Sequence, residues 1–179
     1  MLQIENCCLV VVDVQDKLAQ LMHEKERLFA NIKTLIKAAK ILNIPILWCQ
    51  QAPKALGATL TQIAKLLEDN EPIDKVCFSC CDNDRFSSRL RALNRNQTIV
   101  CGIETHVCIY QTAVHLRQAG YKVTVIADAV SSRTESNKTF ALNKMQSMAI
   151  DISTTEMALF ELLKTAEHPA FRQVAKLIK

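Results

Sequence analysis

Three residues with reactive side chains interrupt apolar segments of this sequence, and together they could carry out nucleophilic catalysis. Asp13 stands in LVVVDV and Lys75 in IDKVCF, whereas Cys108 comes three residues after Thr105, a candidate helix cap. The unpaired N–H groups and the positive dipole at a helix start favour a thiolate and can stabilise an oxyanion. A nearby cation lowers the pKa of a thiol, and a carboxylate can accept its proton. The residue types therefore indicate a nucleophilic Cys108 assisted by Asp13 and Lys75.

Each of these residues also has a structural interpretation, which the spacing alone leaves open. Asp13 could cap a helix, Lys75 could be a solvated charge that protects an edge strand, and Cys108 could be a small buried residue. Histidine is the usual base for a catalytic cysteine. His106 is only two residues from Cys108 and faces elsewhere on a helix, and the other three histidines lie in loops or further along the chain. A papain-like Cys–His pair is therefore not indicated.

The elements that must position these residues alternate regularly along the chain. Short apolar runs predict strands at 7–14, 45–50, 73–78, 98–103, 121–127 and 149–152. Helical spacing and candidate caps predict helices at 24–42, 59–67 with Thr59 as cap, from the Asp82-Asn83-Asp84 cluster, 105–120, 137–148, 154–165 and from Pro169. This order predicts an α/β fold of three layers, α/β/α, with a largely parallel sheet of about six strands in one domain, 1–179.

Parallel sheets of this kind bind ligands at the carboxyl ends of their strands. Gln15, Trp48, Thr105 and Tyr110 stand at or just past predicted strand ends. We therefore expect these four side chains to line a substrate pocket.

The composition excludes several classes of site. Only three glycines occur, Gly57, Gly102 and Gly120, so neither a GxGxxG dinucleotide motif nor a Walker phosphate loop is present. A net charge of +4, from 22 basic and 18 acidic residues, does not by itself indicate a nucleic-acid partner. The basic run of Arg85, Arg89, Arg91 and Arg95 has Asp82 and Asp84 nearby and lacks an aromatic platform, which favours a solvated helix face.

The start of the chain and its apolar runs bear on the compartment, and through it on the state of the eight cysteines. No apolar run approaches the ~20 residues of a membrane span, and the start MLQIENCC lacks the features of a signal peptide. We therefore expect a cytoplasmic protein with mostly free thiols and no membrane partner. Cys77-x-x-Cys80-Cys81 lacks a second ligand pair at zinc-finger spacing, so a zinc site is not favoured.

Over nearly its full length the sequence resembles the isochorismatase-like cysteine hydrolases. The matching segments are VVDVQDKL, DKVCFS, VCGIETHVCIYQTA and YKVTVIADAVSSR, and the endings ISTTEMALFELL and HPAFRQVAKLIK resemble family proteins of uncharacterised substrate. The resemblance implies a Rossmann-like sheet and a triad of Asp13, Lys75 and Cys108. In this scheme Asp13 takes the thiol proton, Lys75 orients the pair, and Cys108 forms a thioester that water hydrolyses. It also implies a cis Ile103–Glu104 bond, just after Gly102, and an oxyanion hole made of the Glu104 and Cys108 N–H groups.

Two departures from relatives in that family narrow the expected reaction. The family's nicotinamidases carry Asp-x-His-x-x-His after the second strand, whereas WCQQAPKALGATL has no histidine, so we expect no metal ion and no other cofactor. Isochorismatases proper lack the nucleophilic cysteine. Cys108 therefore implies hydrolysis of a C–N bond in a small amide or ureido compound. The family usually forms dimers or tetramers, which implies a homo-oligomer.

A second class of function stays open from the sequence. The chain could keep the hydrolase fold as an interaction protein without turnover, or respond to oxidants through Cys108.

Overall fold

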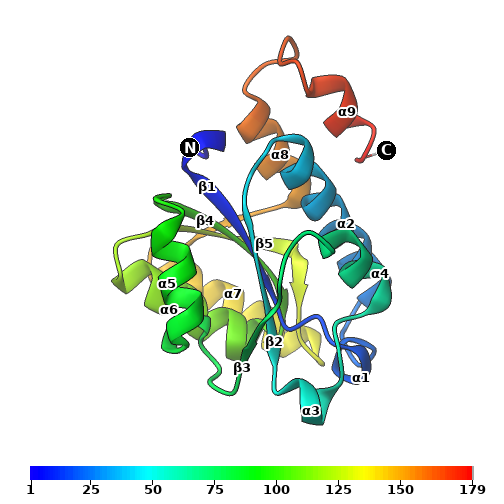
Figure 1. Ribbon diagram of the computed structural model, residues 1–179, viewed down its shortest axis with the longest axis vertical. Coiled ribbons are helices and arrows are strands. Elements are labelled where there is room, and N and C mark those ends of the chain that lie inside the picture. Colours follow the sequence, from blue (N-terminus) through cyan, green and yellow to red (C-terminus); the bar gives the residue numbers. More distant parts are fainter. Residues whose placement is uncertain (179) are drawn as a thin grey trace.

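The computed structural model describes residues 1–178, which form a six-stranded sheet in the order β3-β2-β1-β4-β5-β6. Every neighbouring pair of strands is parallel, which confirms the predicted α/β class (Figure 1). The strands are β1 (Cys7–Val12), β2 (Ile46–Gln51), β3 (Ile73–Lys75), β4 (Gln97–Ile103), β5 (Lys122–Ser131) and β6 (Asp151–Ser153).

Helices cover both faces of this sheet and complete the three layers. One face carries α2 (Lys25–Ile41), α4 (Thr61–Ala64), η2 (Lys65–Leu67), α8 (Thr155–Leu163) and α9 (Phe171–Ala175). The other carries α5 (Asp84–Ala92), α6 (Tyr110–Gln118) and α7 (Glu135–Ser147), as Figure 1 shows. Shorter elements are η1 (Ile4–Asn6), α1 (Asp16–Ala19), α3 (Pro53–Leu56), η3 (Cys80–Asp82) and the π-helical turn η4 (Thr105–Ile109).

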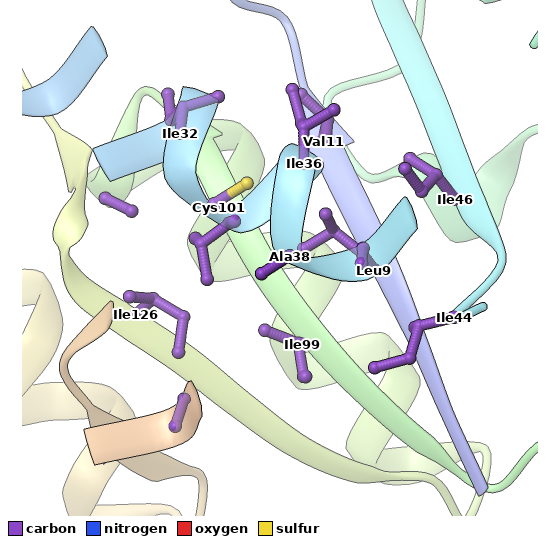
Figure 2. Close-up of a cluster of buried hydrophobic side chains, with 14 of the residues drawn as sticks. Leu9, Val11, Ile32, Ile36, Ala38, Ile44, Ile46, Ile99, Cys101 and Ile126 are labelled. Carbon is purple, nitrogen blue, oxygen red and sulfur yellow. The ribbon is translucent and has the colours of Figure 1, made fainter. Parts of the chain in front are cut away.

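The central strand β1 supplies both hydrophobic cores. Its sequence, CCLVVV, is buried throughout, because side chains of a strand alternate between two covered faces. Leu9 and Val11 face Ile32 and Ile36 of α2 (Figure 2), whereas Val10 and its even-numbered neighbours join the cluster beneath α5 and α6. Each such Leu, Ile or Val contributes about 1.5–3 kcal/mol by leaving water. This burial holds the strand ends, and the residues beyond them, in fixed positions.

The strand order reverses between β1 and β4. From β1 the chain builds β2 and β3 outward on one side, then returns to β4, β5 and β6 on the other. Such a switch point opens a crevice beyond the carboxyl ends of the two strands. Asp13 follows β1 and Cys108 lies just beyond β4, so the topology brings both to this end of the sheet.

Three strands end two or more residues away from the end of the predicted apolar run, each for a local reason. β1 stops before Asp13, whose φ of 54° is left-handed, a conformation that aspartate adopts more readily than most residues. β3 stops at Lys75, because the next residues turn their carbonyls toward its ammonium. β5 runs on to Ser131, since a register shift opposite β4 lets pairing resume at Gly102.

The structure corrects two predicted helix caps. Thr59 does not cap α4, because its hydroxyl accepts a hydrogen bond from the Trp48 indole and donates to Gln50. Thr105 is not a cap but the first residue of η4. By contrast, the predicted starts at Asn83 and near Thr154 are confirmed, since both side chains accept a backbone N–H of the first turn.

Gly102 allows β4 to approach β1 beside the crevice. Its φ is +121°, and a Cβ built on it would lie 2.0 Å from the Val12 carbonyl oxygen. No other residue type fits there, because both the backbone conformation and the space require glycine.

Candidate active site

The ammonium of Lys75 and the carboxylate of Asp13 form a buried ion pair. Nζ lies 2.8 Å from Oδ2, and the two side chains are 0% and 1% exposed. Lys75 Nζ also donates to Gln51 Oε1 at 2.6 Å and to the carbonyls of Cys77 and Phe78 at 3.2 and 3.1 Å. Burial on its own would lower the pKa of Lys75, but the nearby Asp13 carboxylate raises it above its ordinary value. Lys75 therefore stays charged.

The Asp13 carboxyl has one oxygen held and one free. Oδ2 accepts from Lys75, whereas Oδ1 is buried and has no hydrogen-bond partner among residues 1–178. Burial raises the pKa of Asp13, and Lys75 and the Cys108 thiol act in the opposite direction. A carboxylate with a raised pKa and an unoccupied oxygen is suited to accept a proton.

Cys108 lies within η4, and its thiol adjoins Asp13 closely enough for each group to affect the pKa of the other. Burial raises the pKa of the Cys108 thiol, the Asp13 charge raises it further, and Lys75 lowers it. The expectation of a resting thiolate at a helix start is therefore wrong. The turn is π-helical and the thiol is only 7% exposed, so desolvation outweighs the helix dipole.

The backbone between β4 and α6 carries the N–H groups of Glu104 and Cys108, the two that the resemblance implies for an oxyanion hole. The Glu104 carbonyl accepts from the N–H groups of Val107 and Ile109, but not from that of Cys108 between them. Among residues 1–178, the Glu104 N–H has no acceptor. The Ile103–Glu104 peptide is cis, as the resemblance implied. These are the two donors predicted for an oxyanion hole.

The Glu104 side chain points to the neighbouring strand end. Its Oε1 accepts from Arg133 Nε at 2.8 Å, just beyond β5. This ion pair joins the ends of β4 and β5 and thereby orients the backbone at Glu104.

The four residues predicted to line a substrate pocket, Gln15, Trp48, Thr105 and Tyr110, do not all lie on one side of the sheet. Gln15 is fully buried, and its side-chain amide is hydrogen-bonded to the backbone of Gln51 and Gly57. Thr105 is buried beside Glu104, and its Oγ1 has no partner among residues 1–178. Of the four, Thr105 alone keeps a polar atom free for a ligand.

Two of these pocket predictions are not supported by the structure. Trp48 packs in the cluster under α2, on the sheet face opposite Cys108, where its indole binds Thr59. Tyr110 faces α7, with Met148 Sδ 3.8 Å from its hydroxyl and the Lys144 ammonium 4.9 Å from its ring centroid. Standing at a strand end does not decide to which side a side chain turns.

Gln51 is the site residue that the sequence interpretation missed. It is the last residue of β2 and lies opposite Lys75 in the sheet register. Nothing in a single glutamine distinguishes it from a surface residue. The sequence signal that could have indicated Gln51 is its position directly after the predicted strand 45–50, where the family's nicotinamidases carry a metal motif.

The histidines contact other partners. His106 shares a hydrogen bond with Ser132, and His115 lies 3.3 Å from Asp82. Across residues 1–178 no group of three His, Cys, Asp or Glu side chains is arranged to hold a metal ion. The base available to Cys108 in this geometry is Asp13.

The Isochorismatase domain matches residues 7–157, the segment that carries the whole site. The chain belongs to the isochorismatase family. A curated member of this family, the secreted isochorismatase effector Isc1 of Phytophthora sojae, is 36% identical over 96% of this chain and 83% of its own length. Resemblance to the family, inferred from the sequence motifs, is thereby confirmed.

Solved structures show the isochorismatase fold in similar chains. The MAR1 ribonuclease of Caenorhabditis elegans is 35% identical, with a TM-score of 0.93 over 99% of this chain and 91% of that one. The YcaC gene product of Escherichia coli, described as an octameric hydrolase of unknown specificity, has a TM-score of 0.94 at 23% identity, covering 99% and 88% of the two chains. The chain thus has an isochorismatase-family hydrolase fold. No helix within residues 1–178 has both the length and the apolar character to cross a bilayer.

Proposed function

We propose that this protein is a cysteine hydrolase that cleaves the C–N bond of a small amide or ureido compound, without a metal ion or other cofactor. The observation that carries the proposal is the divided Asp13 carboxyl. Oδ2 is fixed by Lys75, Oδ1 has no partner within residues 1–178, and the Asp13 carboxyl and the Cys108 thiol each affect the pKa of the other. This arrangement supplies a base to a thiol that burial keeps protonated at rest.

The reaction runs in two stages. Asp13 Oδ1 takes the thiol proton as Cys108 Sγ attacks the substrate carbonyl carbon, and the carbonyl oxygen receives hydrogen bonds from the Glu104 and Cys108 N–H groups. The C–N bond then breaks, and Asp13 returns the proton to the leaving nitrogen, which gives an amine or ammonia and a thioester. Water, deprotonated by Asp13, attacks the thioester, and the released thiol regains its proton.

The test combines a substrate panel with a direct search for the acyl-enzyme. We expect wild type to hydrolyse at least one member of a panel of small amides, ureides and 4-nitrophenyl acetate, and mass spectrometry to detect an acyl group on Cys108. Cys108→Ser should lose both properties, and Cys81→Ser serves as the matched control because Cys81 lies outside the triad. Hydrolysis by Cys108→Ser at the wild-type rate would overturn the proposal.

Because the Caenorhabditis elegans relative is named a ribonuclease, the substrate panel also includes single-stranded RNA. A thiol next to a carboxylate suits acyl transfer, whereas the site offers no histidine for cleavage of a phosphodiester. We therefore expect no cleavage of single-stranded RNA. Cleavage that survives Cys108→Ser would indicate a different site.

Thiol chemistry without turnover is the second candidate. The buried Cys80 raises the pKa of both Cys108 and Cys49, so two further thiols, Cys80 and Cys49, lie near the triad. Peroxide would oxidise Cys108 to a sulfenic acid, and attack by Cys80 would release water and form a disulfide. A Cys80–Cys108 disulfide in a protein that turns over none of the panel would favour this candidate.

We further propose that the protein works in the cytoplasm as a homo-oligomer, acting on a small molecule and on neither nucleic acid nor membranes. All eight cysteines are free, as suits a reducing compartment. Large exposed apolar side chains, such as Phe140 at 74% and Met157 at 62%, are available for contacts between copies. Light scattering would measure the number of subunits.

A further inference from the structure

The hydrogen-bond donors of Lys75 are fully used by the protein. An ammonium has three N–H donors, and four acceptors surround Nζ: Asp13 Oδ2, Gln51 Oε1 and the carbonyl oxygens of Cys77 and Phe78. The side chain is also completely buried. No N–H of Lys75 is left for a substrate, so its part in the reaction is that of a fixed positive charge.

Gln51 provides the shortest of these four contacts, at 2.6 Å, and its amide cannot turn around. Gln51 Nε2 donates to the Val76 carbonyl at 2.8 Å, which orients Oε1 toward Lys75. Reversing the amide would place two N–H groups against an ammonium. The amide is therefore locked as an acceptor.

A second glutamine holds the backbone of the first. The Gln15 side chain accepts from the Gln51 N–H at 2.6 Å and donates to the Gln51 carbonyl at 2.9 Å, and it also donates to the Gly57 carbonyl at 2.7 Å. Gln15 is fully buried, so this double contact has no competing water. The last residue of β2 is thereby fixed from the turn after β1.

The neutrality of Gln51 matters because Lys75 has one carboxylate partner. The other ionisable groups that affect Lys75 are the thiols Cys80 and Cys108. A second carboxylate at position 51 would compete with Asp13 for the ammonium and repel the Asp13 charge. An amide oxygen binds the ammonium without doing either.

We propose that Gln51 is the positioning residue of this site: its uncharged amide, itself held by Gln15, directs the Lys75 ammonium onto Asp13 and keeps Lys75 away from the substrate. The part of this inference that concerns catalysis rests on the proposed function. The arrangement of the ammonium can be measured without turnover.

The experiment uses the full chain, with lysine ammonium groups observed by ¹H–¹⁵N NMR. Wild type should show one slowly exchanging ammonium signal, absent from Lys75→Met. Gln51→Leu should shift that signal and speed its exchange by about tenfold, the scale of one hydrogen bond to a charged group. Gln62→Leu is the matched control, because Gln62 accepts from Lys33 at 3.2 Å on the exposed surface.

Alkylation of Cys108 by iodoacetamide at pH 8.5 gives the second measurement. Gln51→Leu should slow it about tenfold through the displaced Lys75 charge, and Gln51→Glu should slow it at least as much, since a carboxylate next to Lys75 disfavours the thiolate. A structural role would instead let Gln51→Glu, which keeps the acceptor oxygen, react like wild type. Thermal unfolding identifies any variant that does not fold.

The outcomes separate this inference from the proposed function. If the ammonium signal and the alkylation rate are the same as in wild type in each of the two Gln51 variants, the proposed role of Gln51 is overturned, whatever the enzyme hydrolyses. The expected changes in an enzyme whose hydrolysis survives Cys108→Ser would support the role of Gln51 and overturn the proposed function.

Discussion

Lys75 Nζ and Asp13 Oδ2 lie 2.8 Å apart, although 62 positions separate the two residues in the chain and β2 lies between their strands. Both charges have left water, so each depends on the other for its stabilisation. The pair therefore links the stability of the fold to the chemistry of the site.

Removing the cation should destabilise the protein strongly. Lys75→Met leaves the Asp13 carboxylate buried without its partner, which costs about 3–5 kcal/mol of unfolding free energy. Urea unfolding at pH 7 measures the loss. The double variant Asp13→Asn with Lys75→Met should recover much of it, and a double variant as unstable as Lys75→Met would show that the ion pair is not the cause.

Removing the base should lower turnover strongly, and it should also destabilise the fold because the buried Lys75 ammonium loses its carboxylate partner. Asp13→Asn keeps the shape of the side chain but cannot accept the Cys108 proton, so kcat should fall about 10²- to 10⁴-fold. The rate is measured on whichever panel member wild type hydrolyses. A decrease of less than tenfold, measured where unfolding curves show the variant to be folded, would exclude Asp13 as the general base.

The contact of β4 with β1 should tolerate no side chain. In Gly102→Ala the new Cβ would lie 2.0 Å from the Val12 carbonyl oxygen, at a φ that alanine disfavours. We expect little folded protein on expression, or a large decrease in the midpoint of thermal unfolding. Gly120→Ala shares the positive φ but meets nothing within 4 Å, so it isolates the effect of the clash.

Stability should decline as the pH rises above 9. Burial raises the pKa of Cys7 to about 11 and that of Cys8 to about 12, from an ordinary value of 9.0. In this range the unfolded chain releases thiol protons that the native state keeps, so the unfolded state binds fewer protons and unfolding becomes easier. Each thiol contributes a slope of about 1.4 kcal/mol per pH unit until its native pKa is reached.

Urea unfolding at pH 7, 9 and 10.5 checks this dependence. Cys8→Val should lose one thiol's share of the slope, because valine fills the same buried position without an ionisable group. Equal slopes in Cys8→Val and wild type would contradict the assignment to Cys8.

Trp48 should prove to be a core residue rather than a substrate contact. Trp48→Phe removes the hydrogen bond from the indole to Thr59 and should cost about 1 kcal/mol, with KM and kcat nearly unchanged. Thr59→Val, which removes the same hydrogen bond from the other side, is the paired control. A rise in KM in Trp48→Phe that Thr59→Val does not share would indicate that Trp48 contacts the substrate.

The sequence by itself determined the order and type of the elements, whereas the triad of Asp13, Lys75 and Cys108 follows from the family resemblance and stays a prediction. The spacing of apolar residues predicts the elements, because a strand buried on both faces and a helix buried on one face each require a distinct spacing. Asp13, Lys75 and Cys108 could be found because a charge or a reactive thiol next to apolar runs is unusual, and the motifs around them are those of the family.

Only the tertiary structure decided how these residues meet. The switch point between β1 and β4 brings Asp13 to Cys108, and the side chain of Lys75, the last residue of β3, reaches past β2 to Asp13. Desolvation then reverses the expected charge state of the thiol, and Gln51 gains its importance from a hydrogen bond that spans two strands. Burial and long-range contact are properties of the assembled chain, so no local pattern of residues contains them.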